Sequence, residues 1–130
     1  MSLHQGDAIE LEVAPDPYVT VRYAGASGDF NPIHIDEEFA KQVGLPGRIL
    51  HGLWTMAQVA RAHTEALGGA GGPASLERLS VQFRGMGVME EEVAVTGTVR
   101  EDDSERAVVD SQATQGGKRI IRNGEATIRL

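Results

Sequence analysis

The chain has no cysteine, which excludes disulfide bonds, thiolate nucleophiles and metal sites built from cysteine. Such a composition fits a reducing compartment. No apolar run approaches the ~18 residues of a membrane-spanning helix, so we expect no such helix. Residues 1–15 contain no basic segment followed by an apolar one, so no signal peptide is expected either. A cytoplasmic protein is the simplest interpretation.

Basic residues are few in this sequence. The 12 lysines and arginines are outnumbered by 19 aspartates and glutamates, which gives a net charge of −7. This balance argues against a general binder of nucleic acid or of an anionic membrane, although it is compatible with a local basic patch. The sequence also lacks the motifs GxGxxG, GxxxxGK[ST] and GxSxG. We therefore expect no nucleotide cofactor and no serine nucleophile.

The length of 130 residues predicts a single domain over residues 1–130. A domain of this size buries about two-thirds of the surface of its unfolded chain. A deep pocket is therefore harder for it to build than for a larger enzyme. A second subunit would help to complete one.

The first half of the chain predicts one strand and several helices. Residues 8–13 alternate between apolar and polar side chains, which is typical of a half-buried strand. Residues 18–26 are ambiguous between strand and helix; their spacing favours a helix, with Asp16 and Pro17 suited to its N-cap and first position. A clearer helix follows Asp36, which can cap it, and ends at Gly44.

Residues 53–67 carry the most strongly helical pattern in the chain. The residues predicted to share one face of this helix are Leu53, Met56, Ala57, Ala60, Thr64 and Leu67. Several alanines would allow the helix to pack closely against a sheet. His63 lies off the predicted face, so we expect it at the surface. The glycine-rich residues 68–72, followed by Pro73, end the helix.

The second half of the chain changes to a period of two. Alternating apolar residues predict strands within residues 79–83, 93–99, 107–113 and 121–130, and Gly116 with Gly117 predicts a two-residue hairpin. The expected order is therefore one strand, a helical section and four strands. This order indicates an α+β fold in which an antiparallel sheet curves around one long central helix.

Residues 27–34, with the sequence SGDFNPIH, contain the strongest candidate for chemistry. Asp29 and His34 are five positions apart, and Asn31 with Pro32 between them favours a turn. Such a turn can bring a carboxylate and an imidazole together, as acid–base catalysis requires. The alternative is that Asp29 caps a turn and His34 lies at the surface; spacing alone does not decide between the two.

His51 and Gly52 open the long helix. The first N–H groups of a helix have no intrahelical acceptor, and glycine lets a ligand oxygen approach closely. This is the local arrangement of an oxyanion hole, and an ordinary glycine near a helix start is the alternative. A metal site built from Asp29, His34, Asp36 and His51 matches neither the helical HExxH pattern nor an acidic-loop pattern, so we expect no metal.

Residues 23–34 (YAGASGDFNPIH) and 50–56 (LHGLWTM) resemble the signature of the MaoC-like (R)-specific enoyl-thioester hydratases and dehydratases. The resemblance extends from about residue 19 to residue 130. It implies a hot-dog fold, with the sheet wrapped around the long helix. It also implies dimers whose sheets join edge to edge, with an acyl thioester of CoA or of acyl carrier protein bound near the interface.

The resemblance also assigns roles to individual residues. It implies that Asp29 and His34 hold one water between them, and that the N–H of Gly52 binds the thioester carbonyl. The implied reaction is reversible syn addition of water to a trans-2-enoyl thioester, which yields the (3R)-hydroxyacyl product. Asn31 would hold the loop in shape, and His51 and Trp54 would line the substrate site, with Trp54 touching the acyl chain.

One departure from the pattern concerns the support of Asp29. Some relatives carry a serine on the long helix near this aspartate, where this chain has Ala57 and Ala60. Other groups must therefore orient Asp29. Two further functions fit the same fold, namely an acyl-thioesterase and the catalytic or acyl-binding subunit of a heterodimeric dehydratase. The retained Asp29 and His34 argue against a subunit that only binds.

Overall fold

The computed structural model describes residues 3–67 and 72–130, and the order of its elements is the predicted one. A first strand and four helices are followed by a short 3₁₀ helix and four strands. The elements are β1 (Ala8–Val13), α1 (Val19–Ser27), α2 (Pro32–Ile35), α3 (Glu37–Gln42), α4 (Gly52–Glu65), η1 (Pro73–Ser75), β2 (Leu76–Phe83), β3 (Val93–Asp102), β4 (Arg106–Gln115) and β5 (Lys118–Arg129).

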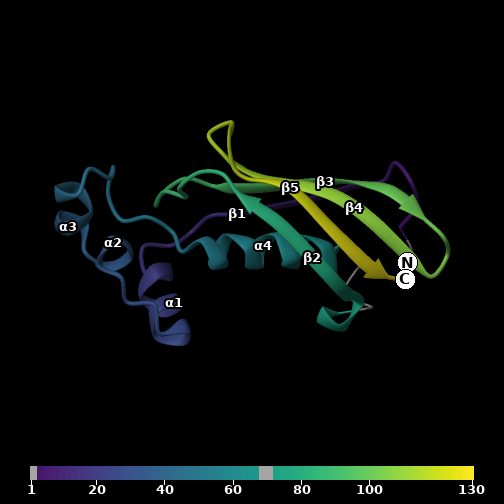
Figure 1. Ribbon diagram of the computed structural model, residues 1–130, viewed down its shortest axis with the longest axis horizontal. Coiled ribbons are helices and arrows are strands. Elements are labelled where there is room, and N and C mark those ends of the chain that lie inside the picture. The colour runs from purple at the N-terminus through teal and green to yellow at the C-terminus, as the bar shows by residue number, and fades with distance from the viewer. Residues whose placement is uncertain (1–2, 68–71) are drawn as a thin grey trace.

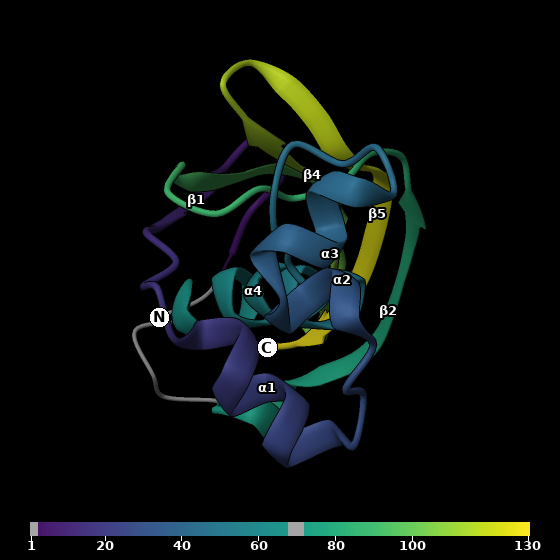
Figure 2. The same cartoon turned by 90° about the vertical axis from the view of Figure 1, so that its left-hand side faces the viewer.

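The five strands form one antiparallel sheet in the order β1-β3-β4-β5-β2. The sheet curves over α4, which lies along its inner face, while α1, α2 and α3 gather at the end of the sheet where α4 begins (Figures 1 and 2). This confirms the predicted α+β class with a central helix. It also means that the segment from α1 to the start of α4 lies at one end of the molecule.

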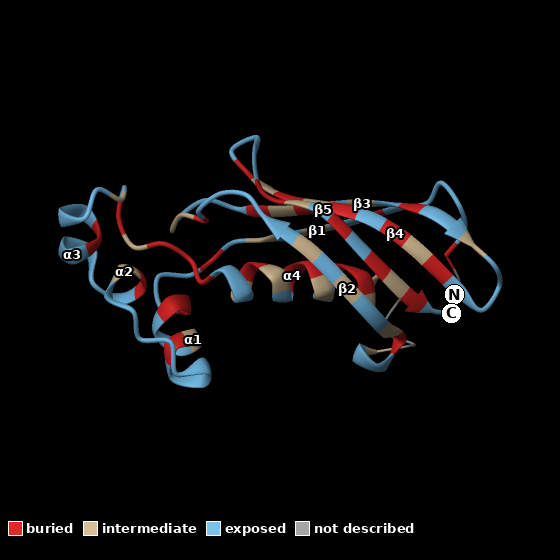
Figure 3. Cartoon of the chain, in the orientation of Figure 1, coloured by how far each residue is buried: buried red, intermediate tan, exposed pale blue. Residues whose placement is uncertain are grey.

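The core lies between the sheet and α4. Alternate residues of the three central strands point inward and are fully buried, and Figure 3 shows this alternation as red and pale segments. Each valine or isoleucine among them contributes roughly 1.5–3 kcal/mol when its side chain is removed from water. The fully buried apolar residues of these strands are Val93, Val95, Val99, Ala107, Val109, Ala113, Ile121, Ala126 and Ile128.

The helical face that packs into this core agrees with the predicted one only in part, since of the predicted residues Leu67 is buried in the core and Met56 packs against it. The buried residues of α4 are Thr55, Gln58, Val59, Ala62 and His63, whereas Leu53 is 61% exposed. Polar residues can face the core because the helix itself satisfies them: the Gln58 amide donates to a carbonyl one turn back, and His63 does the same through Nδ1. A count of apolar residues overlooks such internally bonded side chains.

The prediction that His63 lies at the surface is therefore wrong. Its side chain is fully buried, Nδ1 donates to the Val59 carbonyl at 2.6 Å, and Nε2 has no partner among the described residues. Burial lowers the pKa of His63 below its ordinary value, and the hydrogen bond to Val59 opposes this only in part. The folded protein thus keeps this ring neutral at pH values where the unfolded chain protonates it.

We expect this histidine to make the protein less stable in mild acid. The unfolded chain binds a proton at His63 below about pH 6.5 and the folded chain does not, so the free energy of unfolding falls as the pH drops through that value. The contribution is at most about 1.4 kcal/mol per pH unit. Urea unfolding between pH 7.5 and 5.5 measures it, with His63→Gln as the neutral control. Parallel pH profiles for the two proteins would contradict the assignment.

Two helix starts differ in how well the sequence predicts them. Helix α3 begins as expected, because the Asp36 carboxylate accepts a hydrogen bond from the Phe39 N–H at 3.0 Å. Helix α1 begins two residues later than predicted, after Tyr18, because the Asp16 carboxylate accepts from the Tyr18 N–H and pairs with Arg22 instead of capping.

No helix in the described part of the chain is long and apolar enough to cross a bilayer.

Candidate active site

The loop between α1 and α2 brings Asp29 and His34 together. Helix α1 ends at Gly28, whose φ of 81° turns the chain out of the helix. Asn31 then caps α2 through its side-chain oxygen, which accepts from the Ile33 N–H at 3.2 Å, and Pro32 occupies the first helical position. This short turn leaves the Asp29 Oδ2 atom 3.8 Å from His34 Nε2.

His34 is held with one ring nitrogen committed and the other available. Its ring is buried, and Nδ1 donates to the Ile49 carbonyl at 2.8 Å. A neutral imidazole whose Nδ1 carries the proton presents an unprotonated Nε2, and this atom faces Asp29. At 3.8 Å the two groups are too far apart for a strong direct hydrogen bond, but one water can contact both.

The side chain of Asp29 is oriented by its own loop. Its Oδ1 atom accepts from the Asn31 N–H at 3.2 Å, and its backbone N–H donates to Ser27 Oγ at 3.1 Å. Ser27 in turn donates to the Tyr23 carbonyl at 2.7 Å. These bonds supply the support that the long helix lacks at Ala57 and Ala60. The only sign of this role in the sequence is the position of Ser27 two residues before Asp29.

His51 ties this loop to the start of α4. Its ring stacks on His34 with centroids 3.8 Å apart, and its Nε2 donates to the Asp29 carbonyl at 3.0 Å. The Tyr23 ring also contacts the His51 ring, with centroids 4.7 Å apart. His51 is only 2% exposed. The structure therefore places it beneath the catalytic candidates as a support for both Asp29 and His34.

One group of possible metal ligands is found among the described residues. It consists of Asp29, His34 and His51, whose ligand atoms lie within 4.8 Å of one another. A metal ion lies close to the plane of each imidazole that binds it. The rings of His34 and His51 are stacked with planes 22° apart, so their nitrogens do not converge on one point. Asp36 belongs to a helix cap instead. This arrangement suits proton transfer better than metal binding.

Gly52 is the first residue of α4 and lies beside this group, because His51 precedes it. Its N–H has no acceptor among the residues that the structure describes. A Cβ atom at this position would lie 3.2 Å from the Phe83 ring, so the glycine allows β2 to approach the helix start. Trp54, two residues further along the helix, is half-buried and packs against the core. An unpaired N–H next to an acid–base pair can bind an oxyanion.

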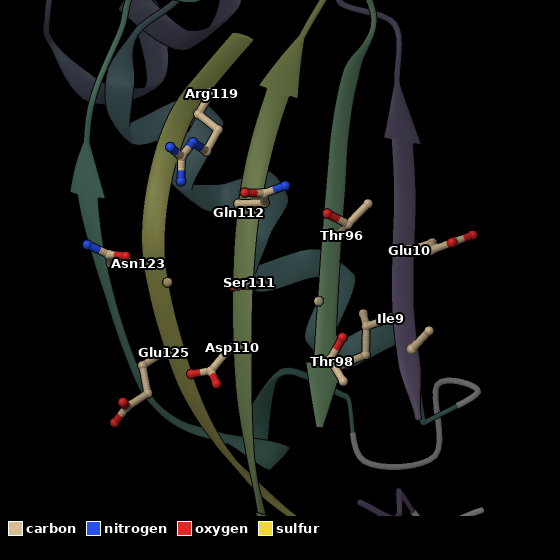
Figure 4. Close-up of a pocket in the computed structure, with 13 residues that line it drawn as sticks. Ile9, Glu10, Thr96, Thr98, Asp110, Ser111, Gln112, Arg119, Asn123 and Glu125 are labelled. Atoms are coloured by element: carbon tan, nitrogen blue, oxygen red, sulfur yellow. The ribbon is translucent and has the colours of Figure 1, made fainter. Parts of the chain in front are cut away.

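A separate polar hollow of about 550 Å³ lies on the outer face of the sheet, with α4 behind it (Figure 4). Its lining includes Asp110 and Glu125, which both pair with Arg100. Asp110 therefore has a lowered pKa because the guanidinium stabilises its charge. No histidine lines this hollow. The hollow does not share the chemistry of the loop around Asp29.

Known proteins resemble this chain in sequence and in fold. A family model described as "MaoC like domain" matches residues 5–119. The fatty acid synthase beta subunit TOXC of Cochliobolus carbonum is 34% identical over 110 residues, which are 82% of this chain and 5% of that protein. The peroxisomal enoyl-CoA hydratase 2 of Arabidopsis thaliana is 42% identical over 57 residues, which are 44% of this chain and 18% of that protein.

Two solved structures resemble the chain over almost its whole length. The (R)-hydratase from A. caviae involved in PHA biosynthesis is 25% identical with a TM-score of 0.87, over 99% of this chain and 98% of that one. The R-hydratase PhaJ1 from Pseudomonas aeruginosa is 25% identical with a TM-score of 0.89, over 98% and 82%. These likenesses confirm the hot-dog fold.

Proposed function

Because this chain belongs to the MaoC-like domain family, we propose that it is a hydro-lyase that adds water to trans-2-enoyl thioesters and forms (3R)-hydroxyacyl thioesters, reversibly. The observation that carries the proposal is the 3.8 Å gap between Asp29 Oδ2 and His34 Nε2, which suits one bridging water. An unpaired N–H at Gly52 lies next to this pair.

In the hydration direction, the bridging water is the nucleophile. Asp29 and His34 both present acceptors, so the water donates its two protons to them and directs a lone pair at the β-carbon of the substrate. The new C–O bond forms at this carbon while His34 Nε2 takes one proton. A proton is then delivered from the pair to the α-carbon on the same face, which completes a syn addition with no proton gained or lost.

The thioester carbonyl makes this addition feasible when its oxygen is bound. Attack at the β-carbon moves electrons through the α-carbon onto that oxygen, which becomes an enolate. The Gly52 N–H at the positive end of α4 stabilises the developing charge. Removing one such donor in related chemistry costs roughly 3–4 kcal/mol of transition-state stabilisation.

Three further residues complete the proposed site. Asn31 and His51 keep the catalytic pair in position. Asn31 caps α2, and His51 donates to the Asp29 carbonyl and stacks on His34. Trp54 is proposed to contact the acyl chain, because it follows Gly52 by two residues and keeps part of its ring accessible. Loss of either supporting bond would widen the gap that holds the water.

We also propose that two chains associate along β2. This strand pairs only with β5 in the described sheet, so its other edge is open. It ends beside the site at Phe83, which is 54% exposed, and Leu53 on α4 is 61% exposed. A second copy would cover these side chains and help to enclose the substrate.

Light scattering on the purified protein tests this association. We expect a mass of twice the 13.9 kDa chain at micromolar concentration. A fully active protein with the mass of one chain would contradict the proposal. A chain that is inactive alone and gains activity only with a different hot-dog chain would instead identify it as one subunit of a heterodimer.

The function itself is tested with crotonyl-CoA and longer trans-2-enoyl-CoAs. We expect the enoyl absorbance to fall on addition of the enzyme, without release of free thiol. Release of CoA thiol with no hydration would show a thioesterase on the same fold and would overturn the proposal.

A further inference from the structure

Four of the 12 lysines and arginines have no ion pair or side-chain hydrogen bond among the described residues. They are Arg78, Arg84, Lys118 and Arg119. The other eight are engaged by carboxylates, by Gln82 or by a backbone carbonyl. In a chain with a net charge of −7, carboxylates outnumber the cations, so the positions of cations without a carboxylate partner are informative.

Three of the four line the same open pocket of about 600 Å³: Arg84 from the segment after β2, and Lys118 and Arg119 from the start of β5. Arg119 also lines the outer hollow, where Figure 4 draws its side chain. Glu91 is the only carboxylate in this lining, so the charged side chains sum to 3 − 1 = +2. A volume of this size is in the range of small-ligand sites, roughly 300–1,000 Å³. The pocket is thus a local positive site on an acidic protein.

The backbone around this pocket is well braced. The buried Gln115 side chain accepts from the Val88 N–H through Oε1 and donates to the Val88 carbonyl through Nε2. The same Nε2 also donates to the Glu91 carbonyl at 3.1 Å. The Arg84 N–H also donates to the Ile120 carbonyl at 2.8 Å. The backbone that carries the three cations is therefore held in place, which lowers the entropy cost of binding an anion.

The predicted two-residue hairpin contributes to this frame. Gly116 and Gly117 both have positive φ, at 54° and 80°, and connect β4 to β5 in a tight turn. Lys118 and Arg119 follow the turn directly. Figure 1 shows this hairpin at the same end of the sheet as the end of β2 and the start of α4.

The pocket is also close to the proposed site. Phe83, whose ring approaches Gly52, immediately precedes Arg84. The Leu50 N–H donates to the Gly87 carbonyl at 2.8 Å, so the segment after β2 runs beside the residues that lead into α4. A ligand that places its thioester at Gly52 can therefore extend a flexible arm towards these cations.

We propose that Arg84, Lys118 and Arg119 bind the phosphates of a CoA thioester, an inference that rests on the proposed function. Guanidinium groups match phosphate oxygens in a bidentate way, and several cations suit a ligand with a diphosphate and a further phosphate. The arm of an acyl carrier protein carries one phosphodiester only. Its acidic surface would also meet a chain that is itself negative overall.

The test compares crotonyl-CoA with crotonyl-pantetheine, which has the same thioester and arm but no phosphate. The first variant is the triple Arg84→Gln/Lys118→Gln/Arg119→Gln. The matched control is Arg78→Gln, which removes the one unpaired cation of the four that lies on β2 and outside the pocket. We expect the triple variant to lower the preference in kcat/KM for crotonyl-CoA over crotonyl-pantetheine by about 10- to 100-fold. The control variant should keep the wild-type preference.

A second readout does not depend on catalysis. Calorimetric titration with adenosine 3′,5′-bisphosphate should show binding to the wild type that weakens with salt and is lost in the triple variant. Unchanged titration and an unchanged substrate preference would overturn the phosphate site while leaving hydration intact. The triple variant could instead lose activity with crotonyl-acyl carrier protein and keep its activity with crotonyl-CoA. That result would overturn the CoA phosphate site and show that the cations bind the carrier protein. Absent hydration with intact bisphosphate binding would count against the proposed function alone.

Discussion

Asp29→Asn and His34→Asn are each expected to lower kcat for crotonyl-CoA hydration by about 10²–10⁴-fold. The first change keeps the oxygen that accepts from the Asn31 N–H and removes the negative acceptor that faces the water. The second can keep a donor to the Ile49 carbonyl and removes Nε2. Because the two groups act on one water, the double variant should lose little more activity than either single variant.

Kinetics of the four proteins measure this coupling, and melting temperatures show that the loop is intact. Both variants are designed to retain the local hydrogen bonds, so we expect melting temperatures close to that of the wild type. Additive losses in the double variant would indicate that Asp29 and His34 act in separate steps. Full activity in either single variant would show that the residue takes no part in the reaction.

Gly52→Pro is expected to lower kcat by about 10²–10³-fold, the usual cost of losing one oxyanion donor. Proline has no N–H, and it is tolerated at the first position of a helix. Gly52 occupies that position, and the residue before it, His51, has ψ of 133°, which suits a residue that precedes proline. The substitution therefore removes the donor while the backbone keeps its path.

The control for this variant is Gly52→Ala, which adds a side chain but keeps the N–H. Its Cβ would lie 3.2 Å from the end of the Phe83 ring, so the ring must shift by a few tenths of an ångström. We expect a much smaller loss of kcat for alanine than for proline. Equal losses in the two variants would mean that space at the helix start matters, and that the N–H does not bind the carbonyl.

Much of the fold could be predicted because it depends on local patterns. The alternation of apolar residues in the later strands, the cap at Asp36 and the glycine pair at residues 116–117 all act over a few residues. The turn at Asn31 and Pro32 is local too, so the proximity of Asp29 and His34 could be proposed from their spacing.

The features that sequence reasoning missed depend on contacts between distant segments or on bonds within a helix. His63 was misplaced because its hydrogen bond to the Val59 carbonyl lets a polar ring face the core. The support of Asp29 by His51 joins residues 22 positions apart. The pocket between Arg84 and Lys118 depends on the pairing of β2 with β5, which no pattern in one sequence specifies.

The stereochemistry of hydration in D₂O tests the central claim most directly. If one water between Asp29 and His34 supplies both atoms to one face of the double bond, crotonyl-CoA should yield (3R)-hydroxybutyryl-CoA with a single deuterium at C2, added syn to the hydroxyl. Chiral chromatography and NMR of the product measure both centres. A (3S) product, or deuterium on the face opposite to the hydroxyl, would contradict the account.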